Sequence, residues 1–283
     1  MTTVTREDVT KSIIDLGIQQ GDTIIVHSSF KSMGYVEGGA ETVVGGILDA
    51  LGSDGTLVFP TLVQKNFTQV YETWHLDKPS DVGYLTNYFR KRPGSLRSDQ
   101  ATHSVAACGK NAVCLTQTHG QSGPRIGCYG TTAFSADSPW EKMYRMDAKI
   151  VMLGVDAKKT TMKHLAEHIY VNKLLDSVKA HPNWHKLVGR LYRVHENYID
   201  SWPSVYGPWV LDRLIEKNAV TYARLGDAQL MCYGSKDFVD TILDALFNED
   251  WGVITWDNDP DGSWIKWKNW VEDCKKIQQE LNH

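Results

Sequence analysis

The chain has 283 residues, of which 42% are hydrophobic and 23% charged, and its mean hydropathy is -0.35. These values are ordinary for a globular protein and exclude a disordered or collagen-like chain. Thirty basic and thirty-four acidic residues give a formal charge of -4 without a dense Lys/Arg block, which argues against a nucleic-acid partner and fits a cationic small substrate better.

The first part of the chain predicts a β-loop-α-β unit. Residues 5–16 place apolar side chains near helical spacing, and the β-branched run at 23–26 fits a strand buried on both faces. A polar loop leads to a second expected helix at 40–51 and then to a second apolar strand at 56–59. A right-handed crossover between two such strands predicts a parallel sheet covered by helices.

A third apolar strand is predicted at residues 149–155, and a short polar loop connects it to the segment TTMKHLAEHIYVNKLL. Apolar residues recur at helical spacing in this segment. We therefore expect a helix that starts near Thr160 or Thr161, either of which would cap it. Residues three apart share one side of a helix, so His164 and Glu167 are expected to lie together.

The remaining stretches are less regular. Residues 60–98 show no clear period, and glycine and serine are frequent at 120–140. We expect both stretches to be long surface loops of the kind that carry function. Past residue 188 the expected elements are strands at 219–222 and 228–233 and helices at 236–248 and 264–281. We interpret 1–283 as a single domain, with 188–283 as a less typical C-terminal extension of it.

Neither disulfides nor a membrane segment is indicated. The cysteines are Cys108, Cys114, Cys128, Cys232 and Cys274. Their odd number and the lack of C-x-x-C spacing argue against a disulfide framework and a thiolate zinc site, and we interpret them as packing residues. The first ten residues lack a basic start followed by an apolar run, and no run of about 18 apolar residues occurs, so we expect a cytoplasmic protein with no membrane partner.

The motif H-x-x-E-H, formed by His164, Glu167 and His168, allows two chemistries. It is the pattern of inverted zinc proteases, in which the two histidines bind zinc and the glutamate activates water. Glu196 or Glu216 would then supply the third protein ligand. Alternatively, the carboxylate fixes the tautomer of His164 and stabilises its protonated form, which makes the histidine a general base. The residues alone leave both open.

A second candidate is the polar loop after the first strand. It carries, in order, Ser28, Ser29, Lys31, Gly38 and Gly39. Backbone N–H groups before a helix and a nearby cation would suit phosphates, although the loop matches neither the P-loop nor G-x-G-x-x-G. Glycines before a helix more often serve as turn residues. His27, at the end of the strand, is interpreted as structural.

Three blocks together resemble the antibiotic N-acetyltransferase family, best known for the aminoglycoside 3-N-acetyltransferases. In chain order they are GDTIIVHSSFKSMGYVEGGAETVVGGILDALGSDGTLVFPT, ATHSVAACGKNA and SADSPWEKMYRMDAKIVMLGVDAKKTTMKHLAEH, within residues 21–168. The resemblance implies a three-layer α/β/α fold with a mostly parallel central sheet. It also implies direct transfer of an acetyl group from acetyl-CoA to an amine, without a covalent enzyme intermediate.

The family motif T-x-x-H-L-A-E implies the catalytic roles. It makes His164 the general base and Glu167 its orienting partner, with Thr161 just upstream. His168 lies outside the motif, so the zinc pattern looks like an accident of adjacency and no metal is expected. The Thr161 hydroxyl or a backbone N–H would bond the developing oxyanion.

The resemblance also implies binding residues. Ser28, Ser29 and Lys31 would lie along the pantetheine and phosphates of acetyl-CoA, with Gly38 and Gly39 at the start of the next helix. A further residue, His103 in ATHSVAA, matches a recurring family position near the active cleft. Either a structural role or a substrate contact fits it.

Two departures from the family pattern concern the acceptor. The usual His-Pro pair after Arg-Ser is replaced here by Gln100-Ala101, and the Trp-rich tail beyond His181 differs from the resistance enzymes. We therefore expect either an aminoglycoside or an amino sugar for a surface polysaccharide as acceptor. The rivals are a zinc hydrolase and a non-catalytic relative that binds coenzyme A, and a homo-oligomer stays open.

Overall fold

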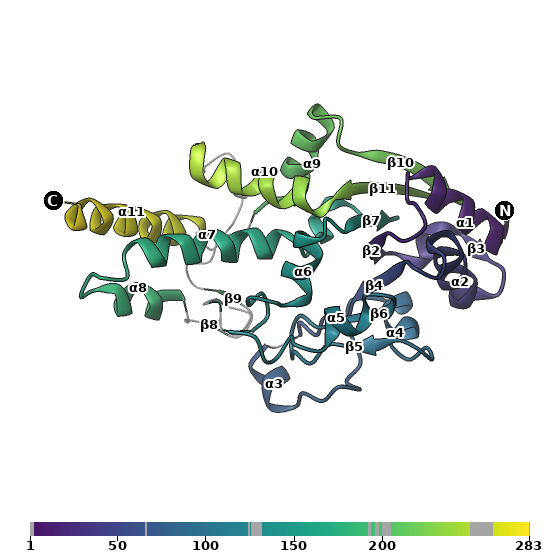
Figure 1. Cartoon of the computed structure of the whole chain (residues 1–283), viewed down its shortest axis with the longest axis horizontal. Coiled ribbons are helices and arrows are strands. Elements are labelled where there is room, and N and C mark those ends of the chain that lie inside the picture. Colours follow the sequence, from purple (N-terminus) through teal and green to yellow (C-terminus); the bar gives the residue numbers. More distant parts are fainter. Residues whose placement is uncertain are drawn as a thin grey trace.

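The computed structural model describes residues 3–65, 67–123, 125, 132–191, 194–195, 198–199, 205–249 and 263–282. Figure 1 shows a central sheet with helices on both faces and the two termini at opposite ends of the long axis. Small elements lie outside this sheet. They are β1 (Thr3–Val4), β3 (Tyr35–Val36), η1 (Phe30–Met33), η2 (Ala157–Lys159), and the hairpin of β8 (Val194–His195) and β9 (Tyr198–Ile199).

Within the described residues the central sheet has seven strands. Their order across the sheet is β10 (Thr221–Leu225), β11 (Ala228–Gly234), β7 (Lys149–Leu153), β2 (Thr23–Ser28), β4 (Thr56–Pro60), β6 (Val105–Gly109) and β5 (Leu96–Arg97). The three central strands, β7, β2 and β4, run parallel, whereas the outer strands pair antiparallel. Antiparallel neighbours need only a short turn, such as the two residues between β10 and β11. The predicted α/β class is confirmed, with its parallel strands at the centre of a mixed sheet.

Alternating side chains of the strands build two hydrophobic layers, because successive residues point to opposite faces. On one face, Ile24 and Val26 pack with α1, α2 and α4. On the other, Ile25 packs with the remaining helices of the core. The first group comprises α1 (Arg6–Asp15), α2 (Gly39–Leu51) and α4 (Tyr84–Phe89); the second comprises α5 (Ala112–Thr116), α6 (Pro139–Arg145), α7 (Lys163–Ser177), α8 (Trp184–Leu191), α9 (Gly207–Glu216), α10 (Ser235–Asn248) and α11 (Ser263–Leu281).

The helix that carries His164 starts later than expected. Its N-cap is Met162, which makes no side-chain cap hydrogen bond, so the prediction of a cap at Thr160 or Thr161 was wrong. Thr160 instead ends the short η2 turn, and its hydroxyl lies 2.6 Å from the Tyr233 hydroxyl of β11. That tertiary contact takes the hydroxyl that a helix cap would have used.

The expectation of loops without secondary structure also needs correction. The stretch 60–98 contains α3 (Phe67–Glu72), α4 and β5, and Leu85 and Phe89 of α4 are buried against the sheet. In the stretch 120–140, Phe134 is buried in the opposite layer. Short elements of this kind are stabilised by tertiary packing, which a local period does not reveal.

The C-terminal part joins the same core. Strands β10 and β11 extend the sheet from β7, and α10 packs on α7. In α11, Trp267 and Trp270 are buried, with stacked rings whose centroids lie 5.3 Å apart. Trp251 and Trp256 lie outside the described residues. The interpretation of 188–283 as an extension of a single domain stays a prediction, and none of the described helices is both long and apolar enough to cross a membrane.

The described cysteines differ in their exposure. Cys232 and Cys274 are buried, as packing residues should be, and Cys108 is half-buried. Cys114 is exposed, so the packing interpretation was wrong for it. These four are free thiols, and Cys128 lies outside the described residues.

Candidate active site

A cavity of about 690 Å³ lies at the carboxyl ends of the three parallel strands. Ser28 ends β2, Pro60 ends β4 and Val155 follows β7, and all three line the cavity. Parallel sheets bind ligands at this edge, and the volume is within the usual range for a small-molecule site. His164 and Thr161, both predicted from the sequence, lie in the same wall.

His164 and Glu167 are in direct contact, as one helical turn requires. His164 Nδ1 lies 2.7 Å from Glu167 Oε2, and the His164 side chain keeps 13% of its surface exposed while Glu167 has none. The second carboxylate oxygen, Oε1, accepts the backbone N–H of Val205 at 3.0 Å. A buried carboxylate is costly unless it is paired, and here both oxygens have partners.

This contact fixes the chemistry of the imidazole. A carboxylate only accepts, so His164 Nδ1 carries the hydrogen and, in the neutral ring, Nε2 holds the lone pair. A proton taken up at Nε2 would give an imidazolium stabilised by Glu167. In chemical terms, this arrangement could serve as a general base with an orienting partner. The pairing expected from the sequence is therefore present in the structure.

His168 has a different environment from His164. It is fully buried, and its Nδ1 lies 2.7 Å from the carbonyl oxygen of His164, to which it donates. Burial lowers the pKa of His168 to about 3. Among the described residues no three His, Cys, Asp or Glu side chains form a group that could hold a metal. Glu216 is exposed on α9, and Glu196 lies outside the described part of the chain.

The ring of Phe134 contacts the histidines from α6's side of the core. Its centroid lies 6.0 Å from that of His164, 4.8 Å from that of His168 and 5.1 Å from that of His103. Trp140, at the start of α6, packs on the same ring at 5.7 Å. Phe134 thereby provides one apolar packing surface for all three imidazole rings.

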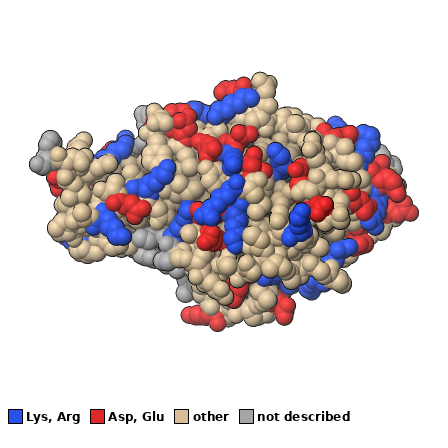
Figure 2. All heavy atoms as spheres, viewed as in Figure 1, with Lys and Arg blue, Asp and Glu red and all other residues tan. Residues whose placement is uncertain are grey.

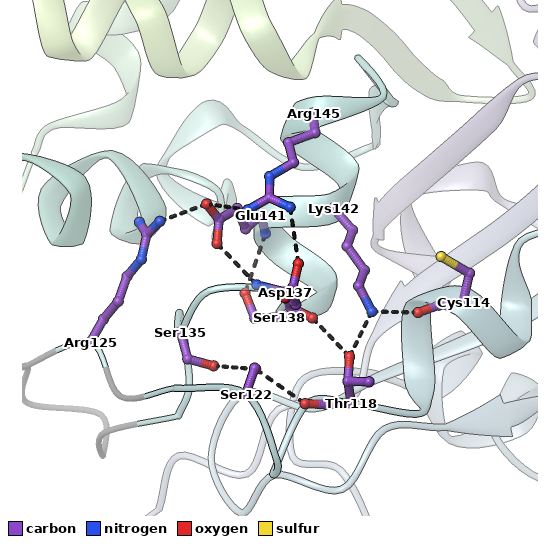
Figure 3. A network of polar contacts seen from close by, with 10 residues as sticks. All are labelled: Cys114, Thr118, Ser122, Arg125, Ser135, Asp137, Ser138, Glu141, Lys142 and Arg145. Carbon is purple, nitrogen blue, oxygen red and sulfur yellow. Dashed lines mark hydrogen bonds and ion pairs between the residues drawn. The ribbon is translucent and has the colours of Figure 1, made fainter.

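A polar network around α6 anchors the segment that contains Phe134 (Figure 3). Glu141 binds Arg125 at 2.6 Å and Arg145 at 3.0 Å, and its other oxygen accepts the backbone N–H of Asp137 at 3.1 Å. Lys142 donates to the Cys114 carbonyl oxygen and to Thr118 Oγ1. Figure 3 shows Glu141 and Lys142 on α6 together with Arg145, whereas Arg125, Asp137 and Thr118 lie on the surrounding loops and Cys114 lies on α5.

His103 is fully buried beside His164, with the two ring centroids 6.1 Å apart. Its Nδ1 lies 2.8 Å from Thr102 Oγ1 and its Nε2 3.4 Å from Gln64 Nε2, and its carbonyl oxygen accepts from Trp140. Burial lowers the pKa of His103 well below its ordinary value. The structure places it behind His164 rather than among the cavity-lining residues.

Gln100, which stands where the family pattern has histidine, organises this buried region. Its Oε1 accepts the backbone N–H of Thr102 at 2.8 Å and that of His103 at 2.5 Å. One amide oxygen therefore orients the turn that carries His103. The departure from the family pattern is accommodated by a complete hydrogen-bond arrangement at this oxygen.

Arg97, on the edge strand β5, holds the stretch that follows β4. Its guanidinium donates to the carbonyl oxygens of Leu76, Lys78 and Thr61 at 2.7, 2.5 and 2.9 Å, and it lies 4.8 Å from the centroid of the Trp74 ring. Burial lowers the pKa of Arg97 to about 10, so it stays charged at neutral pH. The long stretch after β4 is thereby tied to the edge of the sheet.

The described wall of the cavity carries more positive than negative charge. Four lysines and one aspartate line it: Lys65, Lys158, Lys159, Lys163 and Asp81. The Asp81 carboxylate already accepts the backbone N–H groups of Gln64 and Lys65. The net charge of the described wall is thus positive, whereas the formal charge of the whole chain is -4. By contrast, basic and acidic side chains alternate over the face drawn in Figure 2.

The predicted coenzyme loop is only partly at this cavity. Ser28 lines it, whereas Ser29, Lys31, Gly38 and Gly39 are not among the lining residues. Gly38 is the N-cap of α2 with φ 74°, and a Cβ there would lie 2.6 Å from Thr42 Oγ1. This glycine is required by the turn itself.

Sequence reasoning missed much of the wall. Missed residues include Gln64, Asp81, Gly83, Lys158, Lys159 and Lys163. The lysines follow the third predicted strand, so the rule that ligands bind at the carboxyl ends of parallel strands would have found them. Residues 81–86 gave no such signal, because α4 reaches the site from a stretch without a clear period. His27 was assigned a structural role, yet it also lines the cavity.

Comparisons with known proteins identify the family of the chain. Residues 25–246 match the family model described as aminoglycoside 3-N-acetyltransferase. The chain is 30% identical over 182 residues to aminoglycoside N(3)-acetyltransferase VII of Streptomyces paromomycinus. This alignment covers 58% of the present chain and 60% of that protein. It is 28% identical over 185 residues to the prophage-derived aminoglycoside N(3')-acetyltransferase-like protein YokD of Bacillus subtilis (strain 168), covering 58% and 65%. The match thus spans about three fifths of the length of these curated relatives.

Solved structures share the fold. The apoenzyme of aminoglycoside acetyltransferase AAC(3)-IVa aligns with a TM-score of 0.69 and 22% identity, over 97% of this chain and 99% of that one. The structure titled AAC-IIIb binary with CoASH aligns with a TM-score of 0.65 and 17% identity, over 87% and 97%. Because the family model covers most of the chain, this protein belongs to the aminoglycoside 3-N-acetyltransferase family.

Proposed function

We propose that the protein transfers an acetyl group from acetyl-CoA to a primary amine, with His164 as general base and Glu167 as its partner. The observation that carries the proposal is the contact of 2.7 Å between His164 Nδ1 and Glu167 Oε2 at the wall of the cavity. It leaves the lone pair on Nε2, where a neutral imidazole accepts a proton.

The proposed reaction is direct. The amine nitrogen attacks the thioester carbonyl carbon, and His164 Nε2 accepts the proton that the nitrogen loses. The carbon–sulfur bond then breaks, and coenzyme A leaves with that proton. Glu167 stabilises the imidazolium between the two steps, and the hydroxyl of Thr161, in the same wall, is a candidate donor to the oxyanion.

The lysines of the wall support acetyl-CoA as the donor. Phosphate groups of the coenzyme would be attracted to Lys158, Lys159 and Lys163. A protein with the same fold has been solved with CoASH, which supports the same ligand here. Ser28 would contribute a hydroxyl at the end of β2. We retain the proposal that Ser29 and Lys31 lie along the pantetheine and phosphates, with Gly38 and Gly39 at the start of α2.

The acceptor is proposed to be an aminoglycoside or an amino sugar. Related structures have been solved with apramycin and with a gentamicin, which supports an aminoglycoside. The lysines of the described wall favour an acceptor with fewer positive charges than these, such as an amino sugar. Both classes present the amine that the reaction needs.

The test is free-thiol release from acetyl-CoA with a panel of aminoglycosides and amino sugars, with and without a strong chelator. We expect amine-dependent release that the chelator leaves unchanged. Loss of release with the chelator would favour the zinc hydrolase. Tight binding of acetyl-CoA without release for any amine would favour a non-catalytic relative.

A further inference from the structure

His27 is the second histidine in the wall of the cavity. It is the penultimate residue of β2 and pairs in register with Met152 of β7. Paired residues of neighbouring parallel strands point to the same face, and Met152 belongs to the layer of α7. The Sδ atom of Met152 lies 3.6 Å from Thr160 Oγ1, next to Thr161. The side chain of His27 is therefore at the floor of the cavity, on the side of His164.

The Nε2 atom of His27 is buried without a hydrogen-bond partner among the residues that the structure describes. The residue as a whole is only 6% exposed. His119, by contrast, uses both ring nitrogens: Nδ1 lies 2.8 Å from Ser98 Oγ, and Nε2 lies 2.8 Å from the carbonyl oxygen of Ala133. A buried polar atom without a partner costs free energy, and in a native protein it calls for a ligand, a water or a catalytic role.

The chemistry of the site points to a carbonyl oxygen as the missing partner. Burial lowers the pKa of His27 to about 4, so the ring is neutral at physiological pH and offers one N–H. A neutral N–H donor suits an uncharged carbonyl whose oxygen becomes negative during the reaction. The acetyl group must come within reach of His164, which lines the same cavity.

We infer that His27 Nε2–H donates a hydrogen bond to the acetyl oxygen of the bound thioester and holds it as an oxyanion while the amine attacks. This rests on the proposed acetyl transfer. The attacking nitrogen forms its bond to the carbonyl carbon, the carbonyl π electrons move to the oxygen bonded by His27, and His164 Nε2 takes the proton. When the carbonyl re-forms, the carbon–sulfur bond breaks and the thiol leaves with the proton from His164. His27 stays neutral throughout.

Three variants separate this role from a structural one. His27→Phe keeps a flat ring and removes the donor, and His27→Gln retains an N–H near the place of Nε2. His119→Phe is the matched control, a buried histidine away from the cavity that loses two hydrogen bonds. Turnover, the KM for acetyl-CoA and the melting temperature are measured for each.

We expect His27→Phe to lower kcat about 10²- to 10³-fold with little change in KM and no loss of melting temperature, because Nε2 has no hydrogen bond to any described residue that the substitution could remove. His27→Gln should recover at least about tenfold of that loss. His119→Phe should keep normal kcat but melt at a lower temperature. Normal kcat in His27→Phe would overturn the inference, as would a loss of kcat in His27→Gln as large as that in His27→Phe.

A second readout needs no acceptor. The infrared carbonyl band of acetyl-CoA labelled with ¹³C at the thioester carbon is recorded with wild-type protein and with His27→Phe, or with His27→Gln if the former does not fold. If His27 donates a hydrogen bond to the acetyl oxygen, the carbonyl band should be lowered in frequency with the wild-type protein. It should not be lowered with His27→Phe, which has no donor. With His27→Gln it should stay lowered, because the amide N–H replaces the donor. A His27-dependent band without turnover for any amine would leave the inference standing and refute the proposed function. Turnover together with a band frequency that is the same in wild type and His27→Phe would support the proposed function and refute the inference.

Discussion

Helices α2 and α7 cover opposite faces of the same sheet and bury different kinds of side chain. The buried residues of α2 are all apolar or glycine, among them Val43, Val44 and Ile47. Helix α7 buries Leu165 and Val171 but also Glu167 and His168, both without exposed surface. Burying such polar groups is unfavourable unless each has partners, and Glu167 and His168 both have them.

The face covered by α2 contributes to stability, whereas the face covered by α7 also carries the candidate site. The α2 face is built to exclude water, and its close contact with α1 leaves no room for a ligand: a Cβ on Gly46 would lie 2.6 Å from Val9 Cβ. The α7 face combines the buried, fully partnered carboxylate of Glu167 with a histidine of fixed tautomer at a cavity. Substitutions on the two faces should therefore affect different measured quantities.

The largest expected effect is on the α7 face. His164→Ala should lower turnover by about two to four orders of magnitude, the range for a positioned general base, and leave the affinity for acetyl-CoA nearly unchanged. Thiol release and calorimetric titration with acetyl-CoA measure the two quantities. Near-normal turnover in the purified variant would remove His164 from the mechanism.

Glu167→Gln should have a smaller effect, about one to two orders of magnitude in turnover. The amide has a single acceptor oxygen, so it can serve either His164 Nδ1 or the N–H of Val205 but not both. The variant should also be less stable by about 1–3 kcal/mol, from the buried donor left unpaired. If its turnover were lower than that of His164→Ala, the two roles would have to be exchanged.

The buried histidines should make stability depend on pH. Burial lowers the pKa of His27 and His119 to about 4 and that of His168 to about 3, so between pH 6.5 and about 4 the unfolded chain binds protons that the folded protein does not. Their contribution is thus fully present above pH 6.5 and is lost as the pH falls. We expect a loss of about 2 kcal/mol per histidine at pH 5, measured by urea unfolding. Equal unfolding midpoints at pH 7.5 and pH 5 would contradict these pKa shifts.

The smallest effect is expected on the α2 face. Ile47→Val removes one buried methylene group and should lower the free energy of unfolding by about 0.5–1.5 kcal/mol. Turnover of the folded variant should match the wild type within about twofold, because Ile47 is separated from the cavity by the sheet. A tenfold loss of turnover would show that the two faces are coupled.

The sequence predicted the parts of the molecule that local patterns encode. The three central strands and the pair of His164 and Glu167 follow from apolar runs and a three-residue offset. The cap of α7 could not be predicted, because the Thr160 hydroxyl contacts Tyr233, which is 73 residues away. The antiparallel outer strands and the approach of α4 likewise depend on long-range pairing. The unpaired Nε2 of His27 is a property of its surroundings and has no sequence signal.

The measurement that tests the central claim most directly is hydrogen–deuterium exchange with and without acetyl-CoA. If the cavity at the carboxyl ends of the strands is the reaction site, protection should appear at residues 27–28, 60–65, 81–86 and 155–164, while the middle of α2 is unchanged. Protection confined to Lys31, Gly38 and Gly39, with none at 155–164, would place the coenzyme away from His164 and contradict the account.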